Sequence, residues 1–174
     1  DIDGVEVRGQ VNVSLARGSV SAVRVLPTDA PVTESAVVAI EAADQIVLGP
    51  GSLYTSIAAS LVVPGIVDAI NRSGASLVYI ANVVTQDGET LGMDAVDHLD
   101  SLLRITGVRP PSAIVASDSP VLVDPPLEAV GIDAEAAATY GADVVTADLL
   151  DVSAGRPSHD PDRLGVVLRG LVRT

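Results

Sequence analysis

The sequence contains no cysteine, no lysine, no phenylalanine and no tryptophan. The absence of cysteine excludes a disulfide framework, a thiol nucleophile and a thiolate metal site. Because all 10 basic residues are arginine, lysine chemistry within this chain is excluded as well. Tyrosine is the only aromatic residue, so the core must consist of Val, Ile, Leu and Ala. Val-rich runs of this kind favour a parallel sheet covered on both faces.

Positive charge is also scarce. The formal net charge of −13 argues against nucleic-acid phosphate or an anionic membrane as the main partner, because both require basic patches. No apolar run approaches the ~20 residues of a membrane-spanning helix, and the N-terminus does not resemble a signal peptide. We therefore expect a cytoplasmic protein without a membrane span, whose partners are small molecules, other proteins or a second copy of itself.

Length and composition predict one domain over residues 1–174. A chain of 174 residues with 48% hydrophobic residues is globular and can bury a sizeable core. It begins at Asp1, without a methionine and inside an apparent pair of strands. We therefore expect a piece of a longer protein.

The hydrophobic pattern predicts alternating helices and strands. Short apolar runs predict buried strands at residues 45–48, 76–82, 112–117 and 142–145. Helical spacing predicts helices at residues 33–43, 53–72, 94–105 and 160–173. Alternation of apolar residues predicts a hairpin over residues 5–26, and residues 118–134 are expected to be irregular.

Details of these helices can be predicted too. Thr33 or Asp29 would cap the first helix and Asp160, followed by proline, would cap the last. Pro64-Gly65 should break the second helix. Together the elements predict an α/β fold, a Rossmann-like three-layer sandwich with a mostly parallel sheet. Ligands of such folds bind beyond the carboxyl ends of the strands, so loops 49–56 and 83–92 should face one crevice.

The first of these loops reads GPGSLYTS. Gly49 and Gly51 allow the backbone to approach a ligand, and Ser52, Thr55 and Ser56 supply hydroxyl groups at a helix N-terminus, where an anion is favoured. The motif is neither a Walker A loop nor GxGxxG. The loop is thus either a seat for a ligand anion or a tight structural connection.

The second loop follows another buried strand and reads NVVTQDGET. Its polar side chains surround Gly88 and comprise Asn82, Thr85, Gln86, Glu89 and Thr90. Amides can bind the edge of a base or sugar, and a carboxylate can bind a ribose diol or a metal. A solvated loop followed by a helix capped by Asp94 explains the same residues.

Two histidines complete the candidate groups. His98 lies one turn into the helix that begins at Asp94, where a surface or capping role competes with ligand binding. His159 precedes the predicted cap Asp160. The two are too far apart in sequence to form a metal motif, and the acidic residues between 94 and 100 are typical of a solvated helix face.

Four segments in this order resemble the gluconeogenesis factor family, which is related to the 2-phospho-L-lactate transferases of coenzyme F420 biosynthesis. They read LGPGSLYTSI, LVVPGI, NVVTQDGETLG with Asp97-His98, and HDP at residues 159–161. The resemblance covers nearly the whole chain. The first loop is similar to the gluconeogenesis-factor branch, because the transferases usually have GPSNP at this position.

The resemblance implies a regulatory protein that binds UDP-sugars, notably UDP-N-acetylglucosamine. It also implies a role in growth on gluconeogenic carbon sources and in cell shape and wall synthesis, with no catalytic residue, metal or firm cofactor. A transferase of the 2-phospho-L-lactate type is the alternative. The implied nucleotide-sugar-binding residues are Gly49, Pro50, Gly51, Ser52, Tyr54, Thr55, Ser56, Asn82, Thr85, Gln86, Gly88, Glu89, Thr90, His98 and His159.

The chain departs from the family pattern in three respects. It lacks the family's N-terminal glycine-rich strand-turn-helix, so it would hold about half of the nucleotide site. Met93 replaces an aromatic residue of many members. Ser158 replaces an arginine that precedes His-Asp and is implicated in binding the sugar nucleotide, and Arg156 is the nearest substitute.

Overall fold

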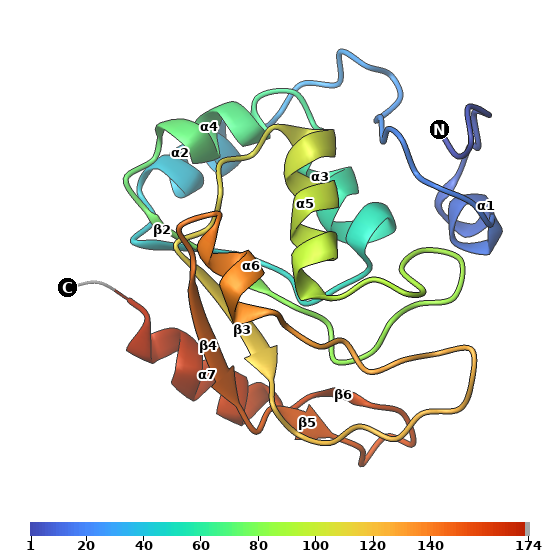
Figure 1. Cartoon of the computed structure of the whole chain (residues 1–174). Helices are drawn as coiled ribbons and strands as arrows, with labels where there is room; N and C mark the ends of the chain where they lie inside the picture. The colour runs from blue at the N-terminus through green and yellow to red at the C-terminus, as the bar shows by residue number, and fades with distance from the viewer. Residues whose placement is uncertain (173–174) are drawn as a thin grey trace.

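A four-stranded sheet in the order β1-β2-β3-β4 forms the centre of the molecule, and all neighbouring strands are parallel (Figure 1). The computed structural model describes residues 1–172. The strands are β1 (Gln45–Leu48), β2 (Ser76–Ile80), β3 (Ala113–Ser117) and β4 (Asp143–Ala147). Because the strands are parallel, their carboxyl ends lie along one edge of the sheet. The predicted α/β fold is confirmed, and each of the four predicted strands is present.

Side chains of the strands alternate between two cores. Leu77 and Tyr79 of β2 belong to the larger core, whereas Val78 and Ile80 belong to the smaller one. This period of two is the expected consequence of a pleated strand. The core is mainly aliphatic, as predicted, but Tyr54 and Tyr79 also belong to it, which the expectation of a core of Val, Ile, Leu and Ala alone did not include.

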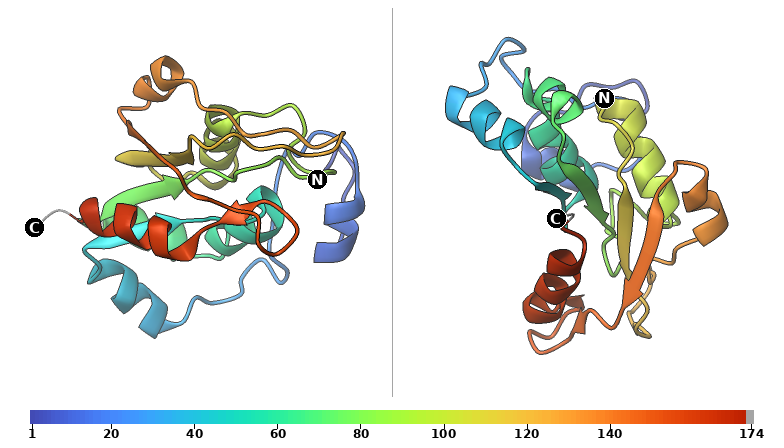
Figure 2. Two further views of the ribbon diagram at one scale, coloured as in Figure 1. Left: turned by 90° about the horizontal axis from the view of Figure 1, so that it is seen from below. Right: turned by 90° about the vertical axis from the view of Figure 1, so that its left-hand side faces the viewer.

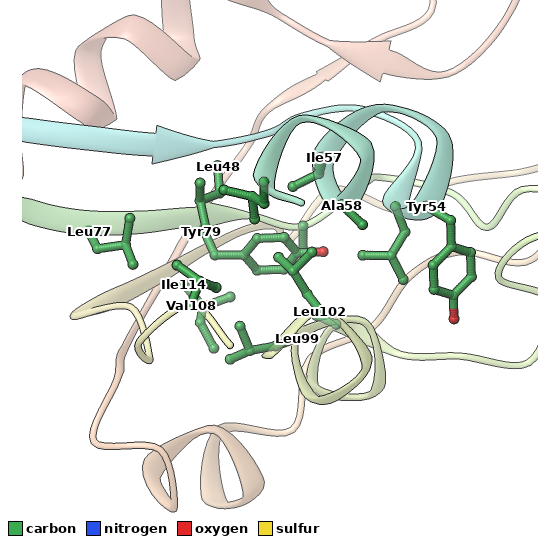
Figure 3. Packing of buried hydrophobic residues seen from close by; sticks show 14 of the residues in the cluster. Leu48, Tyr54, Ile57, Ala58, Leu77, Tyr79, Leu99, Leu102, Val108 and Ile114 are labelled. Atoms are coloured by element: carbon green, nitrogen blue, oxygen red, sulfur yellow. The ribbon is translucent and has the colours of Figure 1, made fainter. Parts of the chain in front are cut away.

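The helices lie on both faces of the sheet (Figure 2). On the larger core lie the π-helix η1 (Leu53–Ala58), α3 (Ala59–Leu61), α4 (Ile66–Arg72) and α5 (Ala95–Thr106). Figure 3 shows the ring of Tyr79 among side chains of η1 and α5, with Ile57 and Leu102 nearby. On the other face, α7 (Pro161–Gly170) contributes Leu164 to the smaller core.

The predicted helix signals are confirmed at three places. Asp94 caps α5 by accepting hydrogen bonds from the Val96 and Asp97 amides, and Asp97 completes a capping box. Asp160 caps α7 in the same manner, with Pro161 in its first turn. The 53–72 stretch breaks at Pro64-Gly65, and its two halves are bent by 73°.

The hairpin predicted for residues 5–26 is wrong. Residues 10–15 form a short helix, α1 (Gln10–Leu15), and the only pairing in this region is the isolated bridges of Ile2 with Val5 and Val20. The alternation misled because it does not correspond to burial: α1 has no buried residue, and Val11 is 71% exposed. Asn12 Nδ2 and Ser14 Oγ each donate to the carbonyl four residues earlier, which stabilises the helical turn.

Other elements differ in smaller ways. Helix α2 (Glu34–Glu41) begins after Thr33, but the Thr33 side chain does not bond the helix backbone, and Asp29 is not at the cap position. Residues 118–133 are irregular as predicted. The sequence did not predict α6 (Ala134–Ala138) or the small ribbon of β5 (Leu150–Asp151) and β6 (Ser158–His159). The predicted end of the last helix at Arg173 lies outside the described residues.

Within residues 1–172, no single helix has the length and apolar character needed to cross a membrane. One bent pair, Leu53–Leu61 with Ile66–Arg72, meets the requirement by length and composition alone.

Candidate functional site

Loops 49–56 and 83–92 are joined at the carboxyl edge of the sheet, as the strand order predicts. Asn82 lies two residues after the end of β2 and binds Gly51 twice: its Oδ1 accepts from the Gly51 amide at 3.2 Å, and its Nδ2 donates to the Gly51 carbonyl at 3.0 Å. Gly49 lies against the same strand with φ of 95°, and a Cβ there would be 2.9 Å from the Ile80 carbonyl oxygen. Only glycine fits this position without displacement of the backbone.

The carboxylate of Glu89 occupies the N-terminus of η1. Its Oε2 accepts from the Tyr54 amide at 3.0 Å and its Oε1 accepts from the Thr55 hydroxyl at 2.7 Å. Glu89 is only 8% exposed. A helix N-terminus favours a negative charge, and here that charge comes from the protein itself. In this structure, two of the donors that the sequence suggested for a ligand anion are therefore bound to Glu89.

The remaining polar groups of loop 83–92 also bind within the protein. The Thr85 hydroxyl accepts from the backbone amide of Glu128 at 2.9 Å, and the Thr90 hydroxyl accepts from the backbone amide of Gln86 at 2.9 Å. Gln86 Nε2 lies 3.4 Å from Glu89 Oε1. Three of these side chains, Thr85, Glu89 and Thr90, are buried. Their role in this structure is to fix the loop, which the dense polar sequence alone did not reveal.

A contribution that sequence reasoning missed comes from residues 127–131. This segment runs beside residues 83–85 through an antiparallel bridge between Val84 and Ala129. Glu128 Oε2 also accepts from the Gly92 amide at 3.0 Å. Ala129 lies 45 positions after Val84, in a Pro- and Asp-rich stretch without hydrophobic periodicity, so no sequence signal pointed to this contact.

The N-terminal segment covers one end of the same loop. The Ser14 and Ala16 carbonyl oxygens approach Gly88 so closely that a Cβ there would lie 2.6 Å from the former. Arg17 forms an ion pair with Asp87 at 3.0 Å. Gly88 has φ of 85°, so glycine is required here both by backbone conformation and by the approach of α1.

The two histidines are in different environments. His98 is completely buried, contrary to a surface or capping role, and both ring nitrogens are without a hydrogen-bond partner among the described residues. Burial lowers the pKa of His98, against the opposing effect of Asp94 and Asp97. His159 is half-buried in β6. Burial also lowers the pKa of His159, opposed by its interaction with the Ala81 backbone beside Asn82.

Three of the predicted site residues are more accessible to solvent than the buried Thr85, Glu89 and Thr90. Pro50 and Ser56 are exposed and Ser52 is half-buried. Within residues 1–172 neither serine hydroxyl forms a side-chain hydrogen bond. The departure at Ser158 can also be placed: its Oγ donates to the Asp151 carbonyl at 3.3 Å, and Arg156, the nearest substitute for the missing arginine, is exposed. In the described part of the chain, no group of three or more acidic or histidine side chains could hold a metal ion.

A cavity of about 390 Å³ adjoins the joined loops. The N-terminal segment forms one wall, and Tyr54, Thr55 and Ala59 form the other. Volumes of this size are typical of small-molecule sites. Of the predicted site residues, only Tyr54 and Thr55 line it, and the Thr55 hydroxyl connects it to Glu89. Sequence reasoning missed the cavity because it assigned the N-terminal segment to a hairpin.

Comparison with known proteins agrees with this architecture. The family model described as 2-phospho-L-lactate transferase CofD matches residues 1–150. The gluconeogenesis factor of Halalkalibacterium halodurans is 42% identical over 119 residues, which cover 68% of this chain and 37% of that protein. A relative from Mycobacterium tuberculosis is 36% identical over 185 residues, which cover 98% of this chain and 51% of that protein.

Solved structures show the same fold. A crystal structure of a Bacillus halodurans protein superposes with a TM-score of 0.88 at 31% identity, covering 96% of this chain and 56% of that one. The present chain thus spans between 37% and 56% of the length of these proteins. By the match over residues 1–150 and the identity to these relatives, the chain belongs to the CofD family and is similar to its gluconeogenesis factors.

Proposed function

We propose that this protein binds a nucleotide-sugar, UDP-N-acetylglucosamine, and acts as a cytoplasmic regulator of growth on gluconeogenic carbon sources and of cell shape and wall synthesis. The observation that carries the proposal is the joining of loops 49–56 and 83–92 at the carboxyl edge of a parallel sheet, beside a cavity of small-molecule size. Ligands of open α/β sheets bind at this edge. The named relative from Halalkalibacterium halodurans supports the gluconeogenic role.

The proposed binding site differs from a phosphate seat at the helix N-terminus. Glu89 already accepts the Tyr54 amide and the Thr55 hydroxyl, so a ligand phosphate would compete with a buried carboxylate for these donors. The less constrained Ser52 and Ser56 are better placed to bind ligand oxygens. Asn82, Thr85 and Thr90 would support the ligand by holding both loops in position.

The second candidate is a transferase, because the matching family model is described as a 2-phospho-L-lactate transferase. General acid–base catalysis needs a group within hydrogen-bond reach of the reacting atom. Glu89 and His98 are the candidates within the proposed site, and both are buried. Their burial favours the regulatory proposal over catalysis by this pair.

Calorimetry on the complete gene product tests the proposal. We expect UDP-N-acetylglucosamine to bind with micromolar affinity, about −7 to −8 kcal/mol. Binding of GDP without binding of any UDP-sugar would favour the transferase. The protein is then incubated with a nucleotide-activated phospholactate, with and without magnesium, and mass spectrometry tests for product. Product that disappears in Glu89→Gln or His98→Ala would replace the regulator with an enzyme.

A further inference from the structure

The cavity beside Thr55 has walls of a particular chemistry. Its largest contribution comes from aliphatic side chains of the N-terminal segment, among them Val7, Val13 and Val23. On the opposite side, Tyr54 is buried and supplies the only aromatic side chain of the lining. Aliphatic residues thus form the larger part of the lining, and its polar side chains are those of Thr55, Asp1, Glu6, Arg8, Gln10 and Arg24.

Charges are distributed unevenly around this cavity. Behind Thr55 lies the carboxylate of Glu89, which has no cationic partner in the described residues. The two arginines of the lining are Arg8, paired with Glu6, and Arg24, paired with Asp1. The side chains of Arg8 and Arg24 are 73% and 51% exposed, which places these guanidinium groups toward solvent.

We propose that the cavity between residues 1–26 and η1 receives the uncharged sugar group of the nucleotide-sugar, while its diphosphate remains outside, near Arg8 and Arg24. This inference rests on the proposed function and adds the orientation of the ligand. It also defines which sugars are accepted: neutral ones bind and anionic ones are excluded.

The physical reason is the cost of placing an anion in this environment. A charged group that leaves water for an apolar wall loses its hydration, and the two arginines of the lining are already paired with the carboxylates of Glu6 and Asp1. The nearby Glu89 carboxylate adds repulsion. A sugar ring, in contrast, presents C–H groups to the valines and hydroxyl groups to Thr55. Guanidinium groups form charge-assisted bonds with phosphate oxygens, so the exposed Arg8 and Arg24 suit a diphosphate, which would compete there with the carboxylates of Glu6 and Asp1.

Three ligands and the complete gene product test this orientation by calorimetry. The probes are UDP, UDP-N-acetylglucosamine and UDP-glucuronate, whose sugar carries a carboxylate. We expect UDP-N-acetylglucosamine to bind at least tenfold more tightly than UDP, and UDP-glucuronate to bind no more tightly than UDP. Equal affinities for UDP-N-acetylglucosamine and UDP-glucuronate would overturn the inference.

Two residues of α1 provide matched variants. Val13 lines the cavity, whereas Val11 is 71% exposed on the same helix. Val13→Glu should abolish the tenfold gain from the sugar, and Val11→Glu should preserve it. Val13→Met adds apolar bulk to the cavity without adding a charge and should also lose the gain. This second variant keeps the test informative if Val13→Glu does not fold.

The outcomes separate this inference from the proposed function. If the wild-type protein binds neither UDP nor UDP-N-acetylglucosamine, the proposed function fails. If both bind but Val13→Met retains the full gain from the sugar, the ligand lies elsewhere and only the cavity assignment is wrong.

Discussion

The Thr55 hydroxyl donates a hydrogen bond to the Glu89 carboxylate at 2.7 Å, which links the loop after β1 to the loop after β2. Neighbouring strands of a parallel sheet bring their following loops together, and here a buried carboxylate fixes that contact. The same carboxylate accepts the Tyr54 amide. Glu89 is thus a positioning residue for the proposed site before any ligand binds.

The first prediction concerns this hydrogen bond. Thr55→Ala removes the shorter of two hydrogen bonds to Oε1 of the buried Glu89 and leaves only the contact with Gln86 Nε2 at 3.4 Å, so we expect the free energy of unfolding to fall by about 1–3 kcal/mol. Ser56→Ala is the control, because the exposed Ser56 hydroxyl has no side-chain partner within residues 1–172; its effect should stay within about 0.5 kcal/mol. Urea unfolding of both variants measures the difference. Equal stability of the two would show that the Thr55–Glu89 bond contributes nothing.

The second prediction separates a role in folding from a role in binding. Asn82 and Asn71 each bind a backbone amide and a backbone carbonyl, but Asn71 bonds Arg109 and Gly107 away from the candidate site. Asn82→Asp removes the donor to a carbonyl in a half-buried site and should reduce stability by about 1–3 kcal/mol, whereas Asn71 is exposed and Asn71→Asp should cost less, because water can replace the lost donor.

Only Asn82→Asp should also weaken binding of UDP-N-acetylglucosamine, because it releases the loop at Gly51 and adds a negative charge. Calorimetry at a temperature where both variants are folded checks this difference. A loss of affinity of the same size in Asn71→Asp would mean that the effect is transmitted through general destabilisation.

The central fold could be predicted from sequence because local signals and burial agreed there. The runs around Ile46, Val78 and Ile114 are apolar, short and bounded by turn residues, and each became a strand. Asp94 and Asp160 cap their helices as predicted, because a helix cap depends on neighbours only a few residues away in sequence. The prediction for the N-terminal segment was wrong because its valines alternate in sequence without alternating in burial: Val11 is 71% exposed, whereas Val20 belongs to the core.

The meeting of loops 49–56 and 83–92 could be predicted from sequence, but the hydrogen bonds between them could not. The order of the strands was enough to place Gly51 near Asn82. That Glu89 would turn inward to Tyr54, and that Glu128 would hold Thr85, depends on contacts between segments far apart in sequence. Dense polar residues are compatible with both ligand binding and internal hydrogen bonding, and periodicity does not distinguish the two.

The third prediction concerns the contact of α1 with Gly88. Gly88→Ala forces a Cβ to within 2.6 Å of the Ser14 carbonyl oxygen and imposes a left-handed conformation on alanine. Gly92→Ala has a similar φ of 74° but no atom within 4 Å of the added Cβ, so it isolates the conformational cost. Gly88→Ala should therefore be the more destabilising of the two, and it alone should displace the N-terminal segment.

Amide hydrogen exchange of residues 10–17 measures this displacement directly. We expect loss of protection in Gly88→Ala and unchanged protection in Gly92→Ala. If the two variants exchange alike, α1 is held by contacts other than the one at Gly88.

The fourth prediction is a dependence of stability on pH through His98. Burial holds the pKa of His98 below its ordinary value of 6.5, against the opposing Asp94 and Asp97. In the unfolded chain this pKa returns to about 6.5. As the pH falls below that value, the unfolded state takes up a proton that the folded state resists. The unfolding free energy therefore decreases toward acid, and the contribution of His98 is complete above pH 6.5.

His98→Leu removes this contribution. Because both ring nitrogens of His98 lack hydrogen-bond partners in the described part of the chain, an apolar replacement should cost little stability at pH 7.5. Between pH 7.5 and pH 5, the wild-type protein should lose more unfolding free energy than the variant, as measured by urea unfolding at several pH values. The pKa of His159 is also lowered by burial, so His159→Leu is the control that removes the second histidine. Parallel pH profiles of the wild-type protein and His98→Leu would contradict the prediction, because a buried neutral imidazole must resist protonation.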